Sequence, residues 1–467
     1  MQRLSPLDAM FIHRDHPETP RQVASLAILK PGDRPLTYDR LIQVINDRID
    51  LVPRYRQVPK RIPGGIGMPV WVDDDHFDLS LHVRRSALPR PGGRDALHEL
   101  VGRLVARRLY HERPLWELYL IEGLENGEIA LLFKSHQALV DGSHTVDLAQ
   151  VLLEETQADR QIPHDDWSPK PTPGVVELVS DSVKSQLRHP AELLWTSEYQ
   201  LNRVVSHIPG LNAESPSHGP LSVTLSRHRR FTSVSAPLAD FRRVRDEHGG
   251  TVNDVILAAI AGGLRGWMLT RAEPVTAKTS FRAMVPMSVT RDQGAGGGLP
   301  TSLGPLVQGL MLTLPVGEAN AVVRLHQVSY SLRGDRETGS AVAANKLATL
   351  PGFATSTFHA VGARVAEAEA NRGYHLTITN VPGPQEPVYM AGQQLLETYP
   401  ALPLSGGRAI AIGVTSYNGQ VYFGIVADRE AVPDADVLAQ CIVESLEELI
   451  DTVGAKRARA PRGRKRP

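Results

Sequence analysis

The fold is decided by one stretch of sequence, residues 116–142, with the sequence WELYLIEGLENGEIALLFKSHQALVDG. It contains two apolar, β-rich runs, Trp116–Glu122 and Glu128–Ser135, on either side of Asn126-Gly127. An Asn-Gly pair between two such runs is a strong β-hairpin signal, because both residues accept the positive φ of a tight turn. We therefore predict a hairpin whose second strand continues directly into His136-Gln137-Ala138-Leu139-Val140-Asp141-Gly142.

The segment after this hairpin is a candidate active site. A strand that delivers polar side chains into a turn closed by Asp141-Gly142 suits one, since Asp bonds to turn backbone and Gly accepts positive φ. From the residues alone, an ordinary strand-to-helix turn competes with this interpretation, and a helix is expected over residues 143–155. The sequence has no Gly-rich phosphate-binding motif, no nucleophile elbow and no His-Glu-x-x-His zinc motif.

Helix and strand patterns alternate on the N-terminal side of the hairpin. Ser5-Pro6-Leu7-Asp8 has the N-cap, N1 proline and acidic third position of a short helix. Gln22–Lys30 and His82–Leu88 are strand-like, whereas apolar residues in Leu41–Ile49 and Leu97–Leu104 have helical spacing.

A second block of such patterns follows a proline-rich connector. The connector is expected to contain a helix over Val175–Val205. Beyond it, Thr251 and Asp254 have the spacing of a capping box at the start of a buried helix. Further strands are predicted at Thr279–Val285, Leu306–Leu314, Tyr374–Thr379, Arg408–Ser416 and Gln420–Ala427, the last two forming a hairpin through Asn418-Gly419, and a helix at Asp436–Ile450.

These patterns predict an α/β fold with mixed sheets, arranged in two halves. We expect an N-terminal lobe over residues 1–160, a crossover linker with a helix over 161–220, a C-terminal lobe over 221–454 and a disordered basic tail over 455–467. The order of helices and strands lacks the regular alternation of a doubly wound nucleotide-binding fold.

Composition and charge exclude several classes of function. The 467 residues are 42% hydrophobic and carry 51 basic and 51 acidic side chains. Residues 455–467 hold seven of the basic residues and no acid, so the rest is mildly acidic, which argues against nucleic-acid binding. The tail is either a solvated extension or a docking segment for lipid headgroups. The single cysteine, Cys441, excludes a disulfide framework and is expected to be buried.

Eight motifs spread in order over residues 3–450 resemble those of bacterial wax ester synthase/diacylglycerol acyltransferases. His136 to Gly142 resembles their His-His-x-x-x-Asp-Gly signature. The other matches are Leu4-Ser5-Pro6-Leu7-Asp8-Ala9, Arg113-Pro114-Leu115-Trp116-Glu117, Val252-Asn253-Asp254-Val255, Val285-Pro286-Met287-Ser288, Thr379-Asn380-Val381-Pro382-Gly383-Pro384, Ser416-Tyr417-Asn418-Gly419, and Ala427-Asp428 with Val432-Pro433-Asp434. The family belongs to the CoA-dependent acyltransferase superfamily, so the resemblance implies two chloramphenicol-acetyltransferase-like lobes with a central channel between them.

The resemblance implies direct acyl transfer from a CoA thioester to a hydroxyl group. This sequence departs from the family pattern at the residue that would act as general base. In the family signature the second histidine is the general base, and this sequence has Gln137 at that position. A neutral imidazole can accept the hydroxyl proton at pH 7, whereas a glutamine amide can only orient the hydroxyl by hydrogen bonds. Because a general base contributes ~10²–10⁴ in rate, we expect a weakened enzyme. A second departure is Gly296-Gly297-Gly298-Leu299-Pro300-Thr301-Ser302, where the family has a Gly-Asn-x-x-Ser-like stretch.

The resemblance also suggests roles for individual residues. The catalytic positions would be Gln137, His136, Asp141 and Gly142. If the strand stays extended, His136 points to the opposite face from Gln137, and Asp141 would be a partner of the turn. Whether His136 or His144 takes over the role of the general base stays open. The substrate-binding positions would be Asn253, Asp254, Pro114, Leu115, Trp116, Asn380 and Tyr417. Simple helix capping is the alternative for Asn253 and Asp254, and core packing is the alternative for Pro114, Leu115 and Trp116.

The predicted function is long-chain O-acyl transfer to diacylglycerol, giving triacylglycerol, or to a fatty alcohol, giving a wax ester. The alternative is a catalytically inactive relative that binds lipid or acyl-CoA. Acyl-CoA is expected as co-substrate. Neither a metal nor a cofactor is expected, and no nucleic acid is expected as a partner. Because no signal peptide or run of about 18 apolar residues is present, we expect a cytoplasmic protein, with peripheral association to the inner membrane face or lipid droplets as a further hypothesis.

Overall fold

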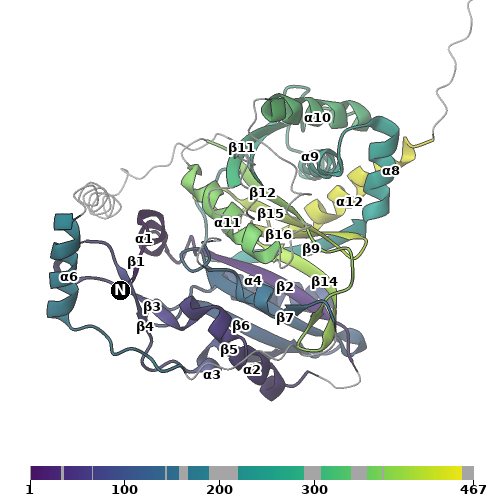
Figure 1. Ribbon diagram of the computed structural model, residues 1–467. Coiled ribbons are helices and arrows are strands. Elements are labelled where there is room, and N and C mark those ends of the chain that lie inside the picture. The colour runs from purple at the N-terminus through teal and green to yellow at the C-terminus, as the bar shows by residue number, and fades with distance from the viewer. Residues whose placement is uncertain are drawn as a thin grey trace, which may run out of the picture.

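Two lobes lie one above the other in the computed structural model (Figure 1). The structure describes residues 2–32, 36–65, 67–141, 145–156, 167–188, 219–288, 307–337, 355–370 and 373–454. Each lobe is built on one mixed sheet, and a small sheet lies at the side of the N-terminal lobe (Figure 1). The predicted Gly296-Gly297-Gly298 loop and the basic tail lie outside the described residues, as does the part of the predicted linker helix beyond residue 188.

The N-terminal lobe is centred on a sheet of seven strands in the described chain. In spatial order they are β5 (Val83–Ala87), β6 (Trp116–Glu122), β7 (Ile129–His136), β2 (Gln22–Leu29), β14 (Gln393–Ala401), β13 (Tyr389–Met390) and β8 (Leu153–Glu154). The predicted hairpin is confirmed: β6 and β7 are antiparallel neighbours, and Asn126 and Gly127 between them have φ of 62° and 71°.

Helices of the N-terminal lobe cover this sheet. They are α1 (Pro6–His13), α2 (Tyr38–Asn46), α3 (Leu79–His82), α4 (Arg94–Ala106) and α5 (Leu148–Val151), with 3-10 turns η1 (Ile49–Leu51), η2 (Pro53–Arg56), η3 (Pro63–Gly65) and η4 (Glu125–Gly127). The start of α1 is as predicted, because Ser5 and Asp8 form a capping box. The prediction of a long helix over 143–155 is wrong: the side chain of Asp147 caps a single turn, α5, which β8 follows at once.

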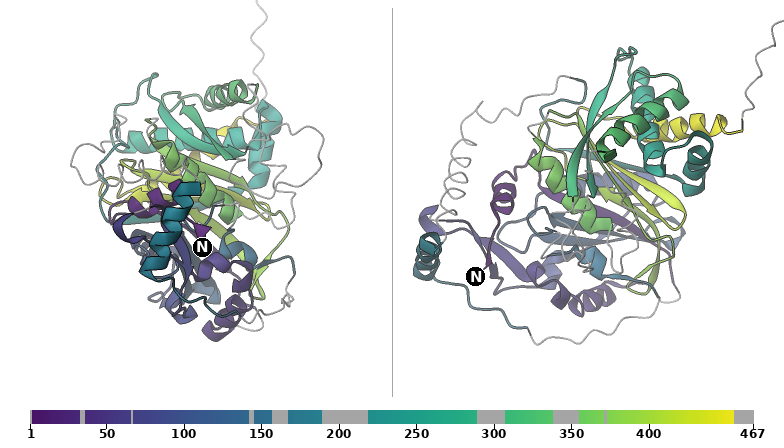
Figure 2. Two further views of the ribbon diagram at one scale, coloured as in Figure 1. Left: turned by 60° about the vertical axis from the view of Figure 1, so that its left-hand side comes forward. Right: turned by 45° about the horizontal axis from the view of Figure 1, so that its top comes forward.

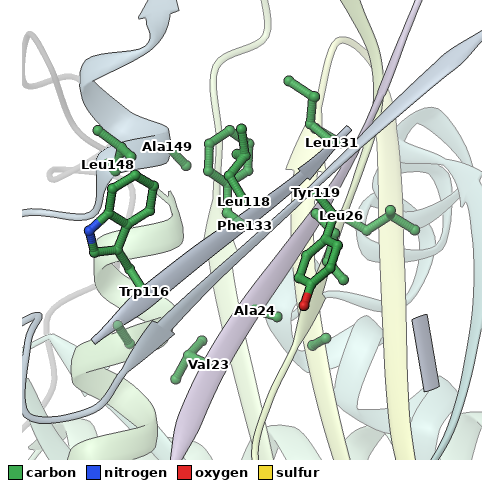
Figure 3. Packing of buried hydrophobic residues seen from close by; sticks show 14 of the residues in the cluster. Val23, Ala24, Leu26, Trp116, Leu118, Tyr119, Leu131, Phe133, Leu148 and Ala149 are labelled. Carbon is green, nitrogen blue, oxygen red and sulfur yellow. The ribbon is translucent and has the colours of Figure 1, made fainter. Parts of the chain in front are cut away.

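The core of this lobe fills both faces of the sheet, as a close view of its centre shows (Figure 3). Trp116 and Phe133 lie on the face that packs against Leu148 and Ala149 of α5, whereas Tyr119 points to the other side. The first of these faces borders Thr355 and Ser356 of the C-terminal lobe, because Phe133 and Ala149 line one cavity with them.

The C-terminal lobe has a six-stranded sheet in the described chain. The strand order is β11 (Val307–Leu314), β10 (Phe281–Ser288), β12 (Leu376–Pro382), β15 (Ile410–Tyr417), β16 (Gln420–Asp428) and β9 (Arg229–Pro237). Its outer face is covered by α8 (Leu238–His248), α9 (Val252–Thr270), α10 (Ala321–Glu337) and α12 (Ala435–Asp451) (Figure 1). Cys441 on α12 is buried, as predicted.

One helix in the described chain, α9, has the length and composition of a membrane span, with a mean hydropathy of 1.2. Its apolar surface is used inside the lobe, because 72% of this stretch is buried. Gly262 and Gly263 let α12 approach closely, since a Cβ at either position would come within 2.4 Å of Ser445 or Ile442. The structure therefore accounts for the hydropathy of α9 as that of a core helix.

Besides the packing of α4 against β9 of the other lobe, two features tie the lobes together. The first is α11 (Thr355–Ala368), which covers the inner face of the C-terminal sheet and contacts β2 of the other lobe (Figures 1 and 2). The second is an exchange of strands: β13 and β14 follow β12 in the chain but pair with β8 and β2. The predicted lobe boundaries therefore need one correction, because residues 389–401 belong in space to the N-terminal lobe, and the other boundaries stay predictions.

The small sheet and one linker helix complete the described chain. The sheet has the order β1 (Gln2–Arg3), β4 (Val70–Asp73), β3 (Gln57–Lys60). Helix α6 (Val175–Arg188) packs Leu178 against Ile62, Val70 and Val72. The described part of the linker thus lies against the N-terminal lobe, beside the first residues of the chain (Figure 1).

Candidate active site

Gln137 lies where the two lobes meet, immediately after β7. Its backbone N–H donates to the carbonyl oxygen of Arg21 at 2.8 Å, and its own carbonyl oxygen accepts from Arg364 of α11. The side chain is 1% exposed, and its Oε1 has no hydrogen-bond partner among the described residues. A buried amide oxygen without a partner is costly, so this atom is a candidate to receive a hydrogen bond from a substrate.

His136, the last residue of β7, has a different environment from Gln137, which already lies in the following turn. Its Nδ1 accepts the backbone N–H of Ala138 at 3.0 Å, which places the proton of the neutral ring on Nε2. That Nε2 points toward Oδ2 of Asp15, 3.9 Å away. Burial lowers the pKa of His136 to about 3, and the fixed Nδ1 leaves the ring without a free acceptor. The side chain therefore anchors the loop through its Nδ1.

Asp15, His111 and His136 form a group of three metal-ligand side chains whose donor atoms lie within 4.8 Å of one another. The hydrogen bonds do not fit a metal ion, because His136 would have to lose its Nε2 proton while Nδ1 is already an acceptor. Asp15 is instead held ionised by His111 at 2.7 Å and by Arg108 at 3.1 Å. The expectation that the protein uses no metal stays a prediction.

Asp141 supports the loop after the motif and borders a large cavity. Its Oδ1 accepts the backbone N–H of Thr145 at 2.9 Å, which is the role of a turn partner. A cavity of about 800 Å³ lies next to it, with charged walls that include Arg54, Arg364 and Asp8. Gly142 and His144, the neighbouring residues of interest, lie outside the described residues.

Helix α11 docks onto the N-terminal lobe through buried ion pairs. Arg364 contacts Oδ1 of Asp8 at 2.7 Å and stacks over Phe11, and Glu367 contacts Arg21 at 2.5 Å. All four charged groups are at least nine-tenths buried. Since unpaired charges of this kind are strongly destabilising, the pairs fix α11 against the loop that carries Gln137.

The first turn of α11 faces the N-terminal lobe through hydroxyl groups. Thr357 Oγ1 accepts the N–H of Asp147 at 2.9 Å and donates to Oε1 of Gln150 at 2.8 Å. Burial raises the pKa of Asp147 to about 6. A narrow apolar cavity of about 30 Å³ lies beside this turn, with walls from both lobes that include Phe133, Ala149, Thr355, Ser356, Thr415 and Tyr417.

Of the predicted substrate-binding residues, the structure brings Asn253 and Asn380 together. The amide of Asn380 donates to Oδ1 of Asn253 at 2.8 Å, and the Nδ2 of Asn253 is buried without a partner in the described chain. Asp254 instead completes a capping box with Thr251 and accepts a hydrogen bond from Ser329. The capping interpretation therefore holds for Asp254, because both carboxylate oxygens are used within the fold.

The remaining predicted residues serve the core in different ways. Pro114, Leu115 and Trp116 are buried, and Trp116 donates its indole N–H to the carbonyl oxygen of Tyr55 and stacks on His82. They pack in the core and line none of the cavities described above, so their assignment to the substrate site is not supported. Tyr417 lines the apolar cavity with its ring, while its hydroxyl donates to the carbonyl oxygen of Leu395.

Family models match both lobes. The wax ester synthase/diacylglycerol acyltransferase catalytic domain matches residues 4–256, and the C-terminal domain of the same enzymes matches residues 303–450. The chain belongs to this family. The resemblance drawn from the motifs is thereby confirmed, and with it the prediction of an acyltransferase.

Individual relatives agree with this assignment. A probable diacylglycerol O-acyltransferase (tgs1) of Mycobacterium tuberculosis is 31% identical over 463 residues, covering 96% of each chain. Another from that species (tgs3) is 40% identical over 265 residues, 52% of this chain and 95% of that protein. The wax ester synthase/diacylglycerol acyltransferase of Marinobacter aquaeolei VT8 superposes with a TM-score of 0.68 at 26% identity, covering 97% of this chain and all of that one.

The fold extends beyond the family. The first condensation domain of the calcium-dependent antibiotic synthetase superposes with a TM-score of 0.55 at 14% identity, covering 97% of both chains. This likeness concerns the fold alone. Together with the Marinobacter enzyme it confirms the predicted architecture of two acyltransferase lobes with mixed sheets.

The sequence reasoning missed the part of the site that α11 supplies. Arg364 and Thr357 contact polar groups of the N-terminal lobe, whereas His359 contacts Thr379 within its own lobe. The only sequence signal was a helix-compatible spacing of Phe358, Val361 and Val365 next to these polar residues. That spacing predicts a helix but does not show which other segment it faces.

Proposed function

We propose that this acyltransferase moves a long-chain acyl group from acyl-CoA to the hydroxyl of diacylglycerol or of a fatty alcohol, in the space between the lobes. The observation that carries the proposal is the junction of Gln137 with α11. There the family motif and a buried amide oxygen without a partner in the described chain meet α11, whose first turn borders the apolar cavity. The names of the relatives support the choice of acceptor.

The two cavities suit different parts of the substrates. The larger one, beside Asp141, has charged and apolar walls and would admit polar portions of the substrates. The apolar one holds about one water molecule at its present size. An acyl chain would therefore have to part its walls, which come from α5, α11, β7 and β15.

The chemistry requires one proton to move from oxygen to sulfur. As the acceptor oxygen bonds to the thioester carbon, its proton leaves; the carbon–sulfur bond then breaks and the thiolate takes up a proton. The Gln137 amide can accept a hydrogen bond from the hydroxyl and so orient it, but it cannot take the proton. We therefore expect catalysis that is slower than with a histidine at this position.

A turnover assay tests this proposal. Purified protein is incubated with labelled oleoyl-CoA and either dioleoylglycerol or hexadecanol, and the lipid products are separated. We expect slow formation of triacylglycerol or wax ester, and a rate increased by ~10² or more in Gln137→His. The matched control is His98→Gln, because His98 on α4 pairs with Ser233 on β9, a contact between the lobes that involves neither Gln137 nor α11.

The alternative function is that of an inactive lipid- or acyl-CoA-binding relative. If neither the natural protein nor Gln137→His forms product while acyl-CoA still binds, the enzymatic proposal fails and this alternative replaces it. Turnover by either protein with either acceptor excludes the alternative.

We also propose peripheral association with an anionic lipid surface, through the basic residues 455–467. The support is the charge of this segment, seven basic residues and no acid, together with the apolar substrates. Flotation with phosphatidylglycerol vesicles should recover the full chain and lose a variant that ends at residue 454. Equal behaviour of the two proteins would contradict this role of the tail.

A further inference from the structure

A second buried histidine lies on α11, the helix that joins the lobes. His359 of α11 is 2% exposed, and its Nδ1 lies 2.6 Å from Oγ1 of Thr379 on β12. Its Nε2 is buried and has no hydrogen-bond partner in the described chain. Buried ring nitrogens normally have a partner, so this atom requires an explanation.

The position of His359 on α11 places it beside the apolar cavity. Thr355 and Ser356 line that cavity and precede His359 by four and three residues, so all three share one face of the helix. The sheet gives the same result: the pairs Thr379–Gly413 and Val381–Thr415 place Thr379 and Thr415 on one face, and Thr415 lines the cavity.

His359 also lies between the cavity and Gln137 along the helix. The first turn of α11 borders the cavity together with Phe133 of β7, whereas Arg364 contacts the carbonyl oxygen of Gln137 just after β7. Helix and strand therefore run side by side from the cavity to the motif. Along the helix axis, residue 359 lies between these two contacts, because it follows Thr355 by four residues and precedes Arg364 by five, and its ring faces Thr379 on the inner face of the C-terminal sheet.

The surroundings of the ring favour its neutral form. Burial lowers the pKa of His359 to about 3, and no charged group contributes to this shift. Thr379 Oγ1 can accept the Nδ1 proton, which leaves the lone pair on Nε2. In this respect His359 is the opposite of His136, whose Nδ1 must accept from a backbone N–H.

We propose that His359 is the general base of the acyl transfer, in place of the histidine that Gln137 replaces. This inference rests on the proposed function. Nε2 takes the proton of the acceptor hydroxyl while the oxygen bonds to the thioester carbon, and Thr379 stabilises the resulting imidazolium. As the carbon–sulfur bond breaks, Nε2 returns the proton to the thiolate, so the products are an ester and free CoA.

Substitution of the ring tests the proposal directly. His359→Gln should lower kcat by ~10² or more, while KM for oleoyl-CoA changes less than ~3-fold. His98→Gln is the matched control, since it also removes a helical histidine that pairs with a hydroxyl, here a half-buried one, and its kcat should be unchanged. The double variant Gln137→His/His359→Gln should regain at least ~10-fold over His359→Gln, because a base is restored at the family position.

A second substitution keeps the proposal testable if His359→Gln does not fold. Thr379→Val removes the hydroxyl next to Nδ1 and should lower kcat by ~10-fold, whereas Thr379→Ser should retain activity near that of the natural protein. Full activity of a folded His359→Gln or of Thr379→Val overturns the proposal. Absence of turnover in the natural protein and in Gln137→His instead refutes the proposed function, so the two failures are distinguishable.

Discussion

The guanidinium of Arg364 on α11 donates a hydrogen bond to the backbone carbonyl oxygen of Gln137, across the boundary between the lobes. The same side chain pairs with Asp8 of α1 at 2.7 Å. One residue thus connects the inner helix of the C-terminal lobe with two separate segments of the N-terminal lobe. The contact between the lobes therefore helps to hold the backbone of Gln137 in place.

We predict that Arg364→Met lowers the free energy of unfolding by about 3–5 kcal/mol, because it leaves the carboxylate of Asp8 buried without its partner. Urea unfolding followed by circular dichroism measures this change. Arg245→Met is the control, since Arg245 pairs with Asp246 at the surface, and its effect should stay within ~0.5 kcal/mol. Equal stability of Arg364→Met and the natural protein would show that the pair does not hold the lobes together.

Local signals predicted most of the elements near the site, because their causes lie within a few residues. The Asn126-Gly127 turn, the capping box of Ser5 and Asp8 and that of Thr251 and Asp254 are set by short-range hydrogen bonds and backbone geometry. These features appear in the structure where the sequence placed them. They fix the hairpin whose second strand ends at His136, next to Gln137, and the start of α9 at Val252, next to Asn253.

The errors and omissions concern long-range contacts. Residues 143–155 resemble a helix in composition, but Asp147 and Leu148 are bound by Thr357 and Tyr55, which are distant in sequence, and only one turn forms. The exchange of β14 into the N-terminal sheet and the docking of α11 have the same character. No periodicity in the sequence shows which partner a strand or helix selects, so the α11 side of the site could not be predicted.

His136 is predicted to be a structural residue and not a base. His136→Asn keeps an acceptor for the N–H of Ala138, so we expect kcat within ~3-fold of the natural value and a loss of about 1–3 kcal/mol in stability. Turnover of oleoyl-CoA and urea unfolding measure the two effects. A fall in kcat of ~10² in a folded protein would assign the base to His136 instead.

Stability should fall as the pH is lowered from 7 to 5. Burial lowers the pKa of His98 to about 4 and that of His136 to about 3, so the unfolded chain takes up protons near pH 6.5 that the folded chain does not. The stabilisation from these neutral rings is complete above pH 6.5 and is lost below it. Asp147 opposes the trend. Burial raises its pKa to about 6, so between pH 7 and pH 5 the folded chain takes up a proton there that the unfolded chain does not.

The histidine effect can be isolated with a single variant. His98→Gln removes one of the titrating rings, so the fall in unfolding free energy between pH 7 and pH 5 should shrink by on the order of 1–2 kcal/mol. Urea unfolding at pH 7, 6 and 5 measures the slope for both proteins. Parallel pH dependences would mean that His98 is protonated alike in the folded and unfolded states.

The apolar cavity should set a limit on the acyl chain if the chain enters there. Ala149 is 6% exposed, lies on α5 and lines the cavity opposite α11, so Ala149→Leu fills space that an incoming chain has to open. We expect kcat/KM for oleoyl-CoA to fall by ~10-fold or more, because overpacking costs about 1–3 kcal/mol, while octanoyl-CoA loses less than ~3-fold. Competition between the two acyl-CoA substrates measures the ratio. If both fall equally, the acyl chain does not pass Ala149, and the larger cavity beside Asp141 becomes its binding site.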